Sequence, residues 1–271
     1  MWNNLSTEDL NKAYNNSLAV SNSAEIIQSW IQSSALVKAN LVGECDISYG
    51  DSPYQAFDYF SAGDHAPVIV FVHGGFWQMR SKNDFTFIAP PLVEAGFSVA
   101  MLGYRLAPHA NMNKIVQDVR DGLEAIHTFI SSANAMPKKF WLLGWSAGAH
   151  LISLVQDEDC VLGGTAVSGI YDLEPIRHCY VNDKLNLDES TALRHSPILL
   201  GQDTFKPLDI LVGGAELPEM QRQSIDFSKY RNSIKATGIF KNIPARNHYT
   251  ILDELLGSDG EILKALNNRL A

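Results

Sequence analysis

The sequence has few basic residues, and they form no run. Lys and Arg total 21 against 30 Asp and Glu, which gives a formal net charge of −9 and a pI of about 5.3. Nucleic-acid binding depends on clustered positive charge that neutralises phosphates, so nucleic acid is not an expected partner. The sequence also lacks a P-loop, a dinucleotide-binding glycine fingerprint and a metalloprotease helix motif, and therefore gives no support to the enzyme classes that depend on them.

Long apolar runs are missing as well. No stretch approaches the roughly 20 apolar residues that a transmembrane helix needs, and residues 1–9 carry neither the basic region nor the apolar core of a signal peptide. Cysteine is scarce: Cys45, Cys160 and Cys179 are odd in number and lack metal-ligand spacing. This usage favours free thiols in a reducing compartment. We therefore expect a cytoplasmic protein with no membrane partner.

The 271 residues, 46% of them hydrophobic, are enough for a single well-packed domain spanning 1–271. Predicted strands alternate with predicted helices, which indicates an α/β fold with a mostly parallel central sheet and helices on both faces. Residues 1–38 are expected to form an N-terminal helical segment, and a homodimer through it is as compatible with the sequence as a monomer. Residues 173–202 are less periodic and are a candidate lid or cap. The expected strands after the first hairpin are 67–72, 97–102, 140–143, 161–168, 207–212 and 237–243.

The pentapeptide GWSAG at 144–148 has the G-x-S-x-G pattern of a nucleophile elbow. It follows the apolar run 140–143, which predicts a short buried strand, and precedes 149–154, which predicts a helix. A sharp turn between a strand and a helix strains the serine backbone and brings neighbouring chain close, so glycines are needed on either side. We therefore predict that Ser146 is a nucleophile.

A serine nucleophile needs hydrogen-bond donors for the oxyanion that it creates. The expected strand 67–72 is followed by His73, Gly74 and Gly75. Glycines just past a strand end allow backbone N–H groups to point at a reacting carbonyl oxygen. Gly74 and Gly75, together with the N–H of Ala147, are therefore the predicted oxyanion hole.

A carboxylate and a histidine follow the two last expected strands. Glu216 comes shortly after 207–212, and His248 comes shortly after 237–243. The carboxyl ends of parallel strands meet at one edge of the sheet, so both side chains are expected near Ser146. The chain order of serine, acid and histidine is that of the α/β-hydrolases. We predict that His248 is the base and that Glu216 holds its imidazole in the required tautomer.

Four other residues compete for these roles. Glu219 is expected in the first turn of a helix, where negative charge is favourable. Asp172 also follows an expected strand, and we interpret it as the cap of the next segment. His73 lies within the glycine turn and is expected to bond backbone there, whereas His150, one helical turn after Ser146, is expected to be a buried and satisfied histidine.

Several aromatic residues flank these motifs and are candidates for lining a substrate pocket. Their rings would stack on an aromatic substrate, although aromatic residues beside a sheet more often belong to the core. Arg177 and Arg194, in the candidate lid, are candidates for binding a substrate carboxylate. The aromatic candidates are Phe76, Trp77, Trp145, Tyr171 and Tyr249.

Three motifs resemble the kynurenine formamidase (arylformamidase) branch of the α/β-hydrolases, which lies close to the hormone-sensitive-lipase-like esterases. They are HGGFW at 73–77, GWSAGAH at 144–150 and ELPEMQRQS at 216–224. Residues 14–16, Val20, 25–30 and 104–108 are also similar to that branch, so the resemblance covers nearly the whole chain.

The resemblance implies a small-molecule substrate, N-formyl-L-kynurenine, hydrolysed to kynurenine and formate in tryptophan breakdown without a metal or a cofactor. Ser146 would attack the formyl carbon. The better-known animal members usually have Tyr where Phe76 stands and Asp where Glu216 stands, and Glu can also serve as the triad acid. A carboxylesterase for small acyl esters would use the same triad and is the alternative. An inactive receptor or scaffold is more remote, because such relatives generally lack the nucleophile or the histidine.

Overall fold

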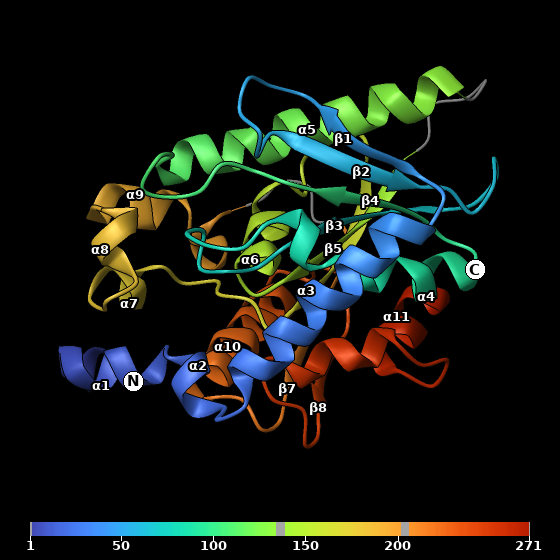
Figure 1. The fold of residues 1–271 in the computed structure, drawn as a ribbon. Helices are drawn as coiled ribbons and strands as arrows, with labels where there is room; N and C mark the ends of the chain where they lie inside the picture. Colours follow the sequence, from blue (N-terminus) through green and yellow to red (C-terminus); the bar gives the residue numbers. More distant parts are fainter. Residues whose placement is uncertain (1, 134–138, 202–205, 271) are drawn as a thin grey trace.

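The chain folds around one eight-stranded sheet with the strand order β1-β2-β4-β3-β5-β6-β7-β8. A computed structural model describes residues 2–133, 139–201 and 206–270 (Figure 1). All neighbouring strands from β4 to β8 are parallel, whereas β2 is antiparallel to both β1 and β4. The predicted mostly parallel α/β sheet is confirmed. Its strands are β1 (Glu44–Ser48), β2 (Ala56–Phe60), β3 (Val68–Val72), β4 (Ser98–Leu102), β5 (Phe140–Trp145), β6 (Val161–Val167), β7 (Leu208–Gly213) and β8 (Phe240–Ile243).

Helices cover both faces of the sheet, because the central strands are apolar on both sides. Alternate residues of β3 belong to separate cores: Val70 packs with α5 (Met112–Ala133), α6 (Ala147–Leu154) and α10 (Pro218–Ser233), whereas Phe71 packs with α4 (Ala89–Glu94) and α11 (Glu261–Leu270). A strand buried on both faces has a continuous apolar sequence, and 67–72 has this pattern.

The N-terminal segment is helical, with η1 (Trp2–Asn4), α1 (Thr7–Ala13), α2 (Asn16–Ala19) and α3 (Ser23–Asn40). Helix α3 crosses the front of the molecule in Figure 1 and packs on two short 3₁₀ helices, η2 (Lys82–Asp84) and η3 (Thr86–Ile88). The buried hydroxyl of Ser34 accepts a hydrogen bond from the N–H of Phe87 at 3.0 Å. The loop after β3 therefore rests against the N-terminal segment.

Two predicted elements differ from the structure. The sequence also predicts a helix around 85–94, but the structure is α-helical only over α4, because the 3₁₀ helix η3 takes up the residues before it. The expected strand 237–243 starts at Phe240, because Gly238 has a φ of +141° and a Cβ there would lie 2.0 Å from the carbonyl oxygen of Leu208. The chain therefore turns at Gly238 before it joins the sheet.

The candidate lid, described up to residue 201, forms three short helices and a final 3₁₀ turn. These are α7 (Glu174–Arg177), α8 (Asn182–Leu185), α9 (Glu189–Arg194) and η4 (Pro197–Leu199). Its Tyr180 donates its backbone N–H to Asn11 Oδ1 at 2.7 Å, so it packs beside α1. Gln202, the last residue of the predicted segment, lies outside the described residues.

The structure bears on two expectations from composition, which are free thiols and the lack of a membrane-spanning helix. Cys45, Cys160 and Cys179 are unpaired thiols. Among the described residues, no helix is both long enough and apolar enough to cross a membrane. The remaining helical element, η5 (Thr250–Leu255), leads from the loop of His248 towards α11.

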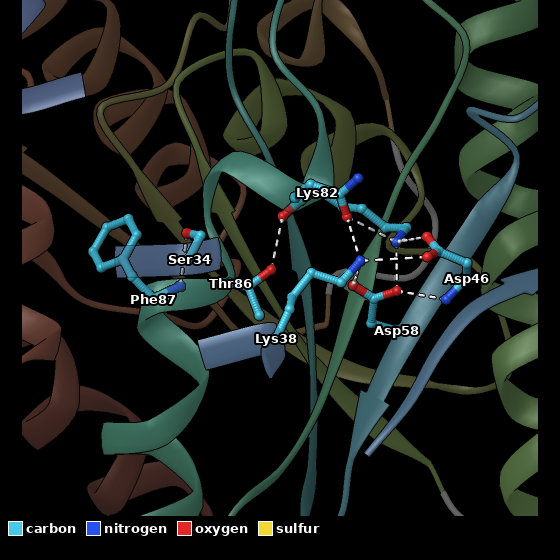
Figure 2. A network of polar contacts seen from close by, with 8 residues as sticks. Ser34, Lys38, Asp46, Asp58, Lys82, Thr86 and Phe87 are labelled. Atoms are coloured by element: carbon cyan, nitrogen blue, oxygen red, sulfur yellow. Dashed lines mark hydrogen bonds and ion pairs between the residues drawn. The ribbon is translucent and has the colours of Figure 1, made fainter. Parts of the chain in front are cut away.

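A cluster of four charged side chains ties α3 to the edge of the sheet and to η2 (Figure 2). Asp58 on β2 is fully buried and pairs with Lys82, which is also buried, and with Lys38 of α3 at 3.2 Å. Lys82 also contacts Asp46 at 2.6 Å, and this hydrogen bond lowers the pKa of the Asp46 carboxyl. Asn83 accepts from Lys38 at 2.8 Å. Buried charges are tolerated only when paired in this way.

Asp58→Asn is expected to lower the free energy of unfolding by about 3 kcal/mol, because it removes the buried partner of two ammonium groups. Urea denaturation followed by circular dichroism measures the change. The control Asp51→Asn, at an exposed turn position, should change the free energy of unfolding by no more than about 0.5 kcal/mol. Equal effects of the two substitutions would show that the cluster does not stabilise the fold.

Candidate active site

Ser146 lies at the turn between β5 and α6, with φ 57° and ψ −118°. This conformation is strained for a residue with a side chain, and such strain persists only where the surroundings enforce it. Here the surroundings are very close: a Cβ on Gly148 would lie 1.9 Å from the carbonyl oxygen of Val72 on β3. The turn therefore holds the serine hydroxyl at the carboxyl edge of the sheet.

Ser146, His248 and Glu216 form one hydrogen-bonded chain. The Ser146 Oγ lies 3.1 Å from His248 Nε2, and His248 Nδ1 lies 2.7 Å from Glu216 Oε2. A carboxylate only accepts, so Nδ1 carries the proton and Nε2 is left to accept from the serine hydroxyl. All three residues are buried. The structure thus brings together the three side chains that sequence motifs singled out, in the geometry required for serine activation.

Two further groups hold the Glu216 carboxylate, and a third holds the histidine. Glu216 Oε1 accepts from the N–H of Gly213 at 2.7 Å and from the hydroxyl of Ser168 at 2.5 Å. The indole N–H of Trp145 donates to the carbonyl oxygen of His248 at 2.9 Å. Sequence reasoning missed Ser168. Its only signal was its position at the end of the strand next to the elbow strand, which placed it beside the predicted acid.

The competing carboxylates lie elsewhere. Glu219 sits in the first turn of α10, where it accepts from the hydroxyl of Tyr14 at 3.3 Å and pairs with Arg222 at 2.8 Å. Asp172 accepts from the N–H of Glu174, the first residue of α7, at 3.0 Å, although the N-cap position of this helix is Leu173. Neither forms a hydrogen bond with His248 among the described residues.

His73 and His150 are both fully buried, and burial lowers the pKa of His73 to about 4 and that of His150 to about 3. Both imidazoles are therefore neutral near pH 7. His73 Nδ1 bonds the carbonyl oxygen of Gly74 at 2.8 Å within the glycine turn. His150 accepts from the indole N–H of Trp77 at 3.1 Å and donates to the carbonyl oxygen of His195 at 2.7 Å. The expectation of structural roles for both is confirmed.

The glycine loop after β3 packs directly against the elbow. A Cβ on Gly74 would lie 2.9 Å from Ser146 Cβ. Gly75 has a φ of +116°, and a Cβ added there would lie only 2.1 Å from the carbonyl oxygen of Met79. Ala147 is the first residue of α6, where the backbone N–H groups have no partner within the helix. Gly74 therefore lies against the Ser146 side chain, Gly75 lines the same cavity as Ser146, and Ala147 follows Ser146 in the chain. The oxyanion hole at these three residues stays a prediction.

A cavity of about 50 Å³ opens above Ser146 and His248. Phe76, Trp145 and Tyr249 line it, as predicted. The N-terminal segment supplies a further wall that sequence reasoning missed, because nothing in a short helical pattern says what the helix covers. The residues that were not foreseen are Asn16, Ser17, Ile27, Trp30, Met79, Arg80 and Phe85.

The prediction that Trp77 and Tyr171 line the substrate pocket is wrong. Trp77 is fully buried and points into the core, where its indole meets His150 edge-on with ring centroids 4.9 Å apart. Tyr171 is also fully buried and stacks on Phe227 of α10 with ring centroids 4.2 Å apart. Both rings belong to the hydrophobic core, where aromatic residues beside a strand are usually found.

The arginines of the candidate lid do not reach the cavity. Arg177 pairs with Glu174 on its own helix at 2.7 Å, and Arg194 bonds Ser190 and Asn113. None of the described residues from 173 to 201 lines the cavity. The N-terminal segment lines it instead, through α2 and α3.

The sheet order, the elbow and the acid–histidine–serine chain define an α/β-hydrolase, and solved structures share this fold. A protein of Silicibacter sp. tm1040, provisionally described as a thioesterase, is 24% identical with a TM-score of 0.83, over 95% of this chain and 98% of that one. Esterase B from Lactobacillus rhamnosis is 19% identical with a TM-score of 0.73, over 92% and 93%. A family model named BD-FAE matches residues 59–159.

Curated relatives narrow the class. Kynurenine formamidase of Danio rerio is 31% identical over 237 residues, covering 82% of this chain and 80% of the relative. That of Salmo salar is 32% identical over 238 residues with the same coverage. The chain therefore belongs to the kynurenine formamidase family.

Gly148→Ala is expected to reduce the free energy of unfolding by at least about 3 kcal/mol, because the added methyl group meets backbone rather than a movable side chain. Urea denaturation measures the loss. Gly257→Ala is the control, since a Cβ there has no neighbour within 4 Å, and it should be neutral within about 0.5 kcal/mol. A Gly148→Ala protein as stable as the control would contradict the close packing of the elbow on β3.

Proposed function

We propose that this protein is an arylformamidase that hydrolyses N-formyl-L-kynurenine to kynurenine and formate through Ser146, His248 and Glu216. The observation that carries the proposal is the hydrogen-bonded chain of these three residues in a member of the kynurenine formamidase family. The reaction would serve tryptophan breakdown, and we place it in the cytoplasm on the evidence of cysteine usage. The catalytic unit in this proposal is the whole chain as a single domain.

Acylation starts with attack of Ser146 Oγ on the formyl carbon while His248 Nε2 takes the hydroxyl proton. Glu216 stabilises the imidazolium that forms, and the N–H groups of Gly74, Gly75 and Ala147 stabilise the oxyanion. The carbon–nitrogen bond then breaks as His248 returns the proton to the arylamine nitrogen. Kynurenine leaves, and a formyl ester remains on Ser146.

Deacylation repeats these steps with water. His248 takes a proton from the water as its oxygen attacks the formyl ester, and the oxyanion occupies the same N–H groups. The ester bond breaks, Ser146 regains its proton from His248, and formate departs. Every proton moves through Nε2, so the tautomer that Glu216 imposes serves both halves of the cycle.

The lining of the cavity suits this substrate. The cavity opens directly at Ser146 and His248, where a small acyl group can meet the nucleophile. Its walls include Phe76, Trp30 and Trp145, whose rings provide stacking surfaces for an arene. Phe76 in place of the more usual tyrosine removes a hydroxyl but leaves the ring.

Hydrolysis of small acyl esters is the second candidate, favoured by the esterase described above with which the chain shares its fold. Both reactions use the same nucleophile and oxyanion donors and differ in the leaving group. An activated ester is therefore expected to react in either case, and the formamide discriminates between the two functions.

We expect the wild-type protein to show a higher kcat/KM for N-formyl-L-kynurenine than for p-nitrophenyl acetate, with the Ser146→Ala protein as the blank. Both compounds present an arene to the aromatic walls of the cavity. In the proposed function the site is adapted to the formyl group and to the amino-acid end of the formamide, whereas the ester reacts because its leaving group is activated. Turnover of the ester without the formamide would identify a small-acyl carboxylesterase. Folded protein that hydrolyses neither would support the receptor alternative.

Ser146→Ala and His248→Ala should each reduce kcat by about 10⁵-fold or more, and Glu216→Ala should be roughly ten- to a hundredfold milder, because its loss misorients a base that is still present. Steady-state kinetics on one acyl substrate measures all three. Asp172→Ala and Glu219→Ala are the matched carboxylate controls. A severe loss in either control with an unaffected Glu216→Ala protein would overturn the assignment of the acid.

A further inference from the structure

Asn16 is a buried amide without partners in the wall of the active-site cavity. It is 3% exposed, and neither its Oδ1 nor its Nδ2 has a hydrogen-bond partner among the described residues. Its neighbours are satisfied: Asn15 Oδ1 caps α2 by accepting from the N–H of Leu18 at 2.9 Å, and the Ser17 hydroxyl bonds Tyr249 at 2.8 Å. Asn16 therefore stands out within its own helix.

Such an arrangement is unfavourable for stability. A buried polar group left without a hydrogen bond costs roughly 1–3 kcal/mol, and native proteins keep few of them. An alanine at this position would avoid the cost of an unpartnered amide. Because Asn16 lines the cavity, a bound ligand can supply the missing hydrogen bonds. One atom of the amide accepts hydrogen bonds and the other donates them, so together they complement a ligand that presents both a donor and an acceptor.

Arg80 lines the same cavity and has no ion pair within the described part of the chain. Arg105 and Arg222, elsewhere in the chain, have the carboxylate partners Asp118 and Glu219. The acid nearest along the chain, Asp84, accepts from the N–H of Ser81 at 3.2 Å, and the charge of Arg80 partly offsets the rise that burial causes in the pKa of Asp84. Arg80 is thus a cation available to a ligand in a protein whose net charge is −9.

The stem of the Arg80 side chain lies beside the glycine loop. Its Cγ lies 3.0 Å from where a Cβ of Gly75 would be, so its stem packs on the glycine loop beside Ser146. Its backbone has a φ of +74°, a strained value for a residue with a side chain. Arg80 and Tyr249 line the same cavity. Burial raises the pKa of the Tyr249 hydroxyl, and the hydrogen bond with Ser17 and the charge of Arg80 partly offset that rise.

We propose that Asn16 and Arg80 bind the α-amino-acid end of the substrate, so that Arg80 and Asn16 Nδ2 donate to the carboxylate and Asn16 Oδ1 accepts from the ammonium group. This inference rests on the proposed formamidase function and assigns the part of the site that selects a zwitterionic leaving group. It also replaces Arg177 and Arg194, which do not line the cavity, as the groups that recognise a carboxylate.

The surroundings hold both residues in place. Lys82, two residues after Arg80, is fixed by Asp46 and Asp58, and Lys38 of α3 reaches the same cluster (Figure 2). The Ser17–Tyr249 bond fixes α2, and therefore Asn16, to the loop of His248. A polar site whose partners are held before the ligand arrives loses less entropy on binding.

The test measures binding separately from turnover. Isothermal titration calorimetry on the Ser146→Ala protein gives the dissociation constants of N-formyl-L-kynurenine and of 2-formamidoacetophenone, which keeps the formanilide and the ketone but lacks the amino-acid end. Asn16→Ala, Arg80→Gln and Arg80→Lys are each added to Ser146→Ala. The matched controls are Asn40→Ala and Arg194→Gln, at exposed positions outside the cavity.

We expect Arg80→Gln and Asn16→Ala to weaken binding of N-formyl-L-kynurenine by roughly ten- to a hundredfold relative to the neutral compound, the range of lost charge-assisted hydrogen bonds. Arg80→Lys should recover part of the loss by keeping the charge. The two controls should leave the ratio of the dissociation constants unchanged. The melting temperature of Asn16→Ala should equal or exceed that of its parent, because an unpartnered buried amide has been removed.

Equal weakening of both compounds in the Asn16 and Arg80 variants, or no weakening of either, would overturn the inference. A melting temperature of Asn16→Ala well below that of its parent would also overturn it, because Asn16 would then be structural. Failure of the proposed function has a different signature: the wild-type protein would not hydrolyse N-formyl-L-kynurenine, although the Ser146→Ala protein still discriminated between the two compounds.

Discussion

The close approach of Gly148 to the carbonyl oxygen of Val72 is the constraint on which the site depends. It fixes the start of α6 against the end of β3, so the serine turn and the glycine loop that follows β3 become neighbours. The parallel register of β5, β6 and β7 then brings Ser168 and Glu216 to the same edge. The packing and register of the sheet therefore set the relative positions of Ser146, Ser168 and Glu216, which lie in the loops at its carboxyl edge.

A second constraint acts from outside the sheet. The buried pairs of Asp58 with Lys82 and Lys38 attach α3 to the loop after β3, and the Ser17–Tyr249 bond attaches α2 to the histidine loop. These contacts close a cavity that the sheet alone leaves open. The sheet edge supplies the hydrogen-bonded chain of Ser146, His248 and Glu216, and the N-terminal segment supplies part of the cavity wall above it.

The proposed nucleophile and acid, Ser146 and Glu216, could be predicted from sequence because they follow the fully buried apolar strands β5 and β7. The strand before His248 is short and largely exposed, so its start was misplaced, but its carboxyl end still lies at the same edge of the sheet. Wall residues such as Asn16 and Arg80 could not be predicted, because their roles depend on where helices outside the sheet come to rest. The prediction that Trp77 and Tyr171 line the pocket was wrong for a different reason. A position next to a motif in the sequence does not say whether the side chain faces the core or the cavity.

The hydrogen bond between Ser17 and Tyr249 joins residues 232 positions apart. Because contacts between distant residues form only after a large loop has closed, the cavity is expected to be completed late in folding. During synthesis, α3 can pack on η2 and η3 soon after it emerges, whereas Ser17 of α2 meets its partner only when the loop of Tyr249 has been made. His248 belongs to the same late loop, so the hydrogen-bonded chain of Ser146 is also expected to form only when synthesis of the domain is nearly finished.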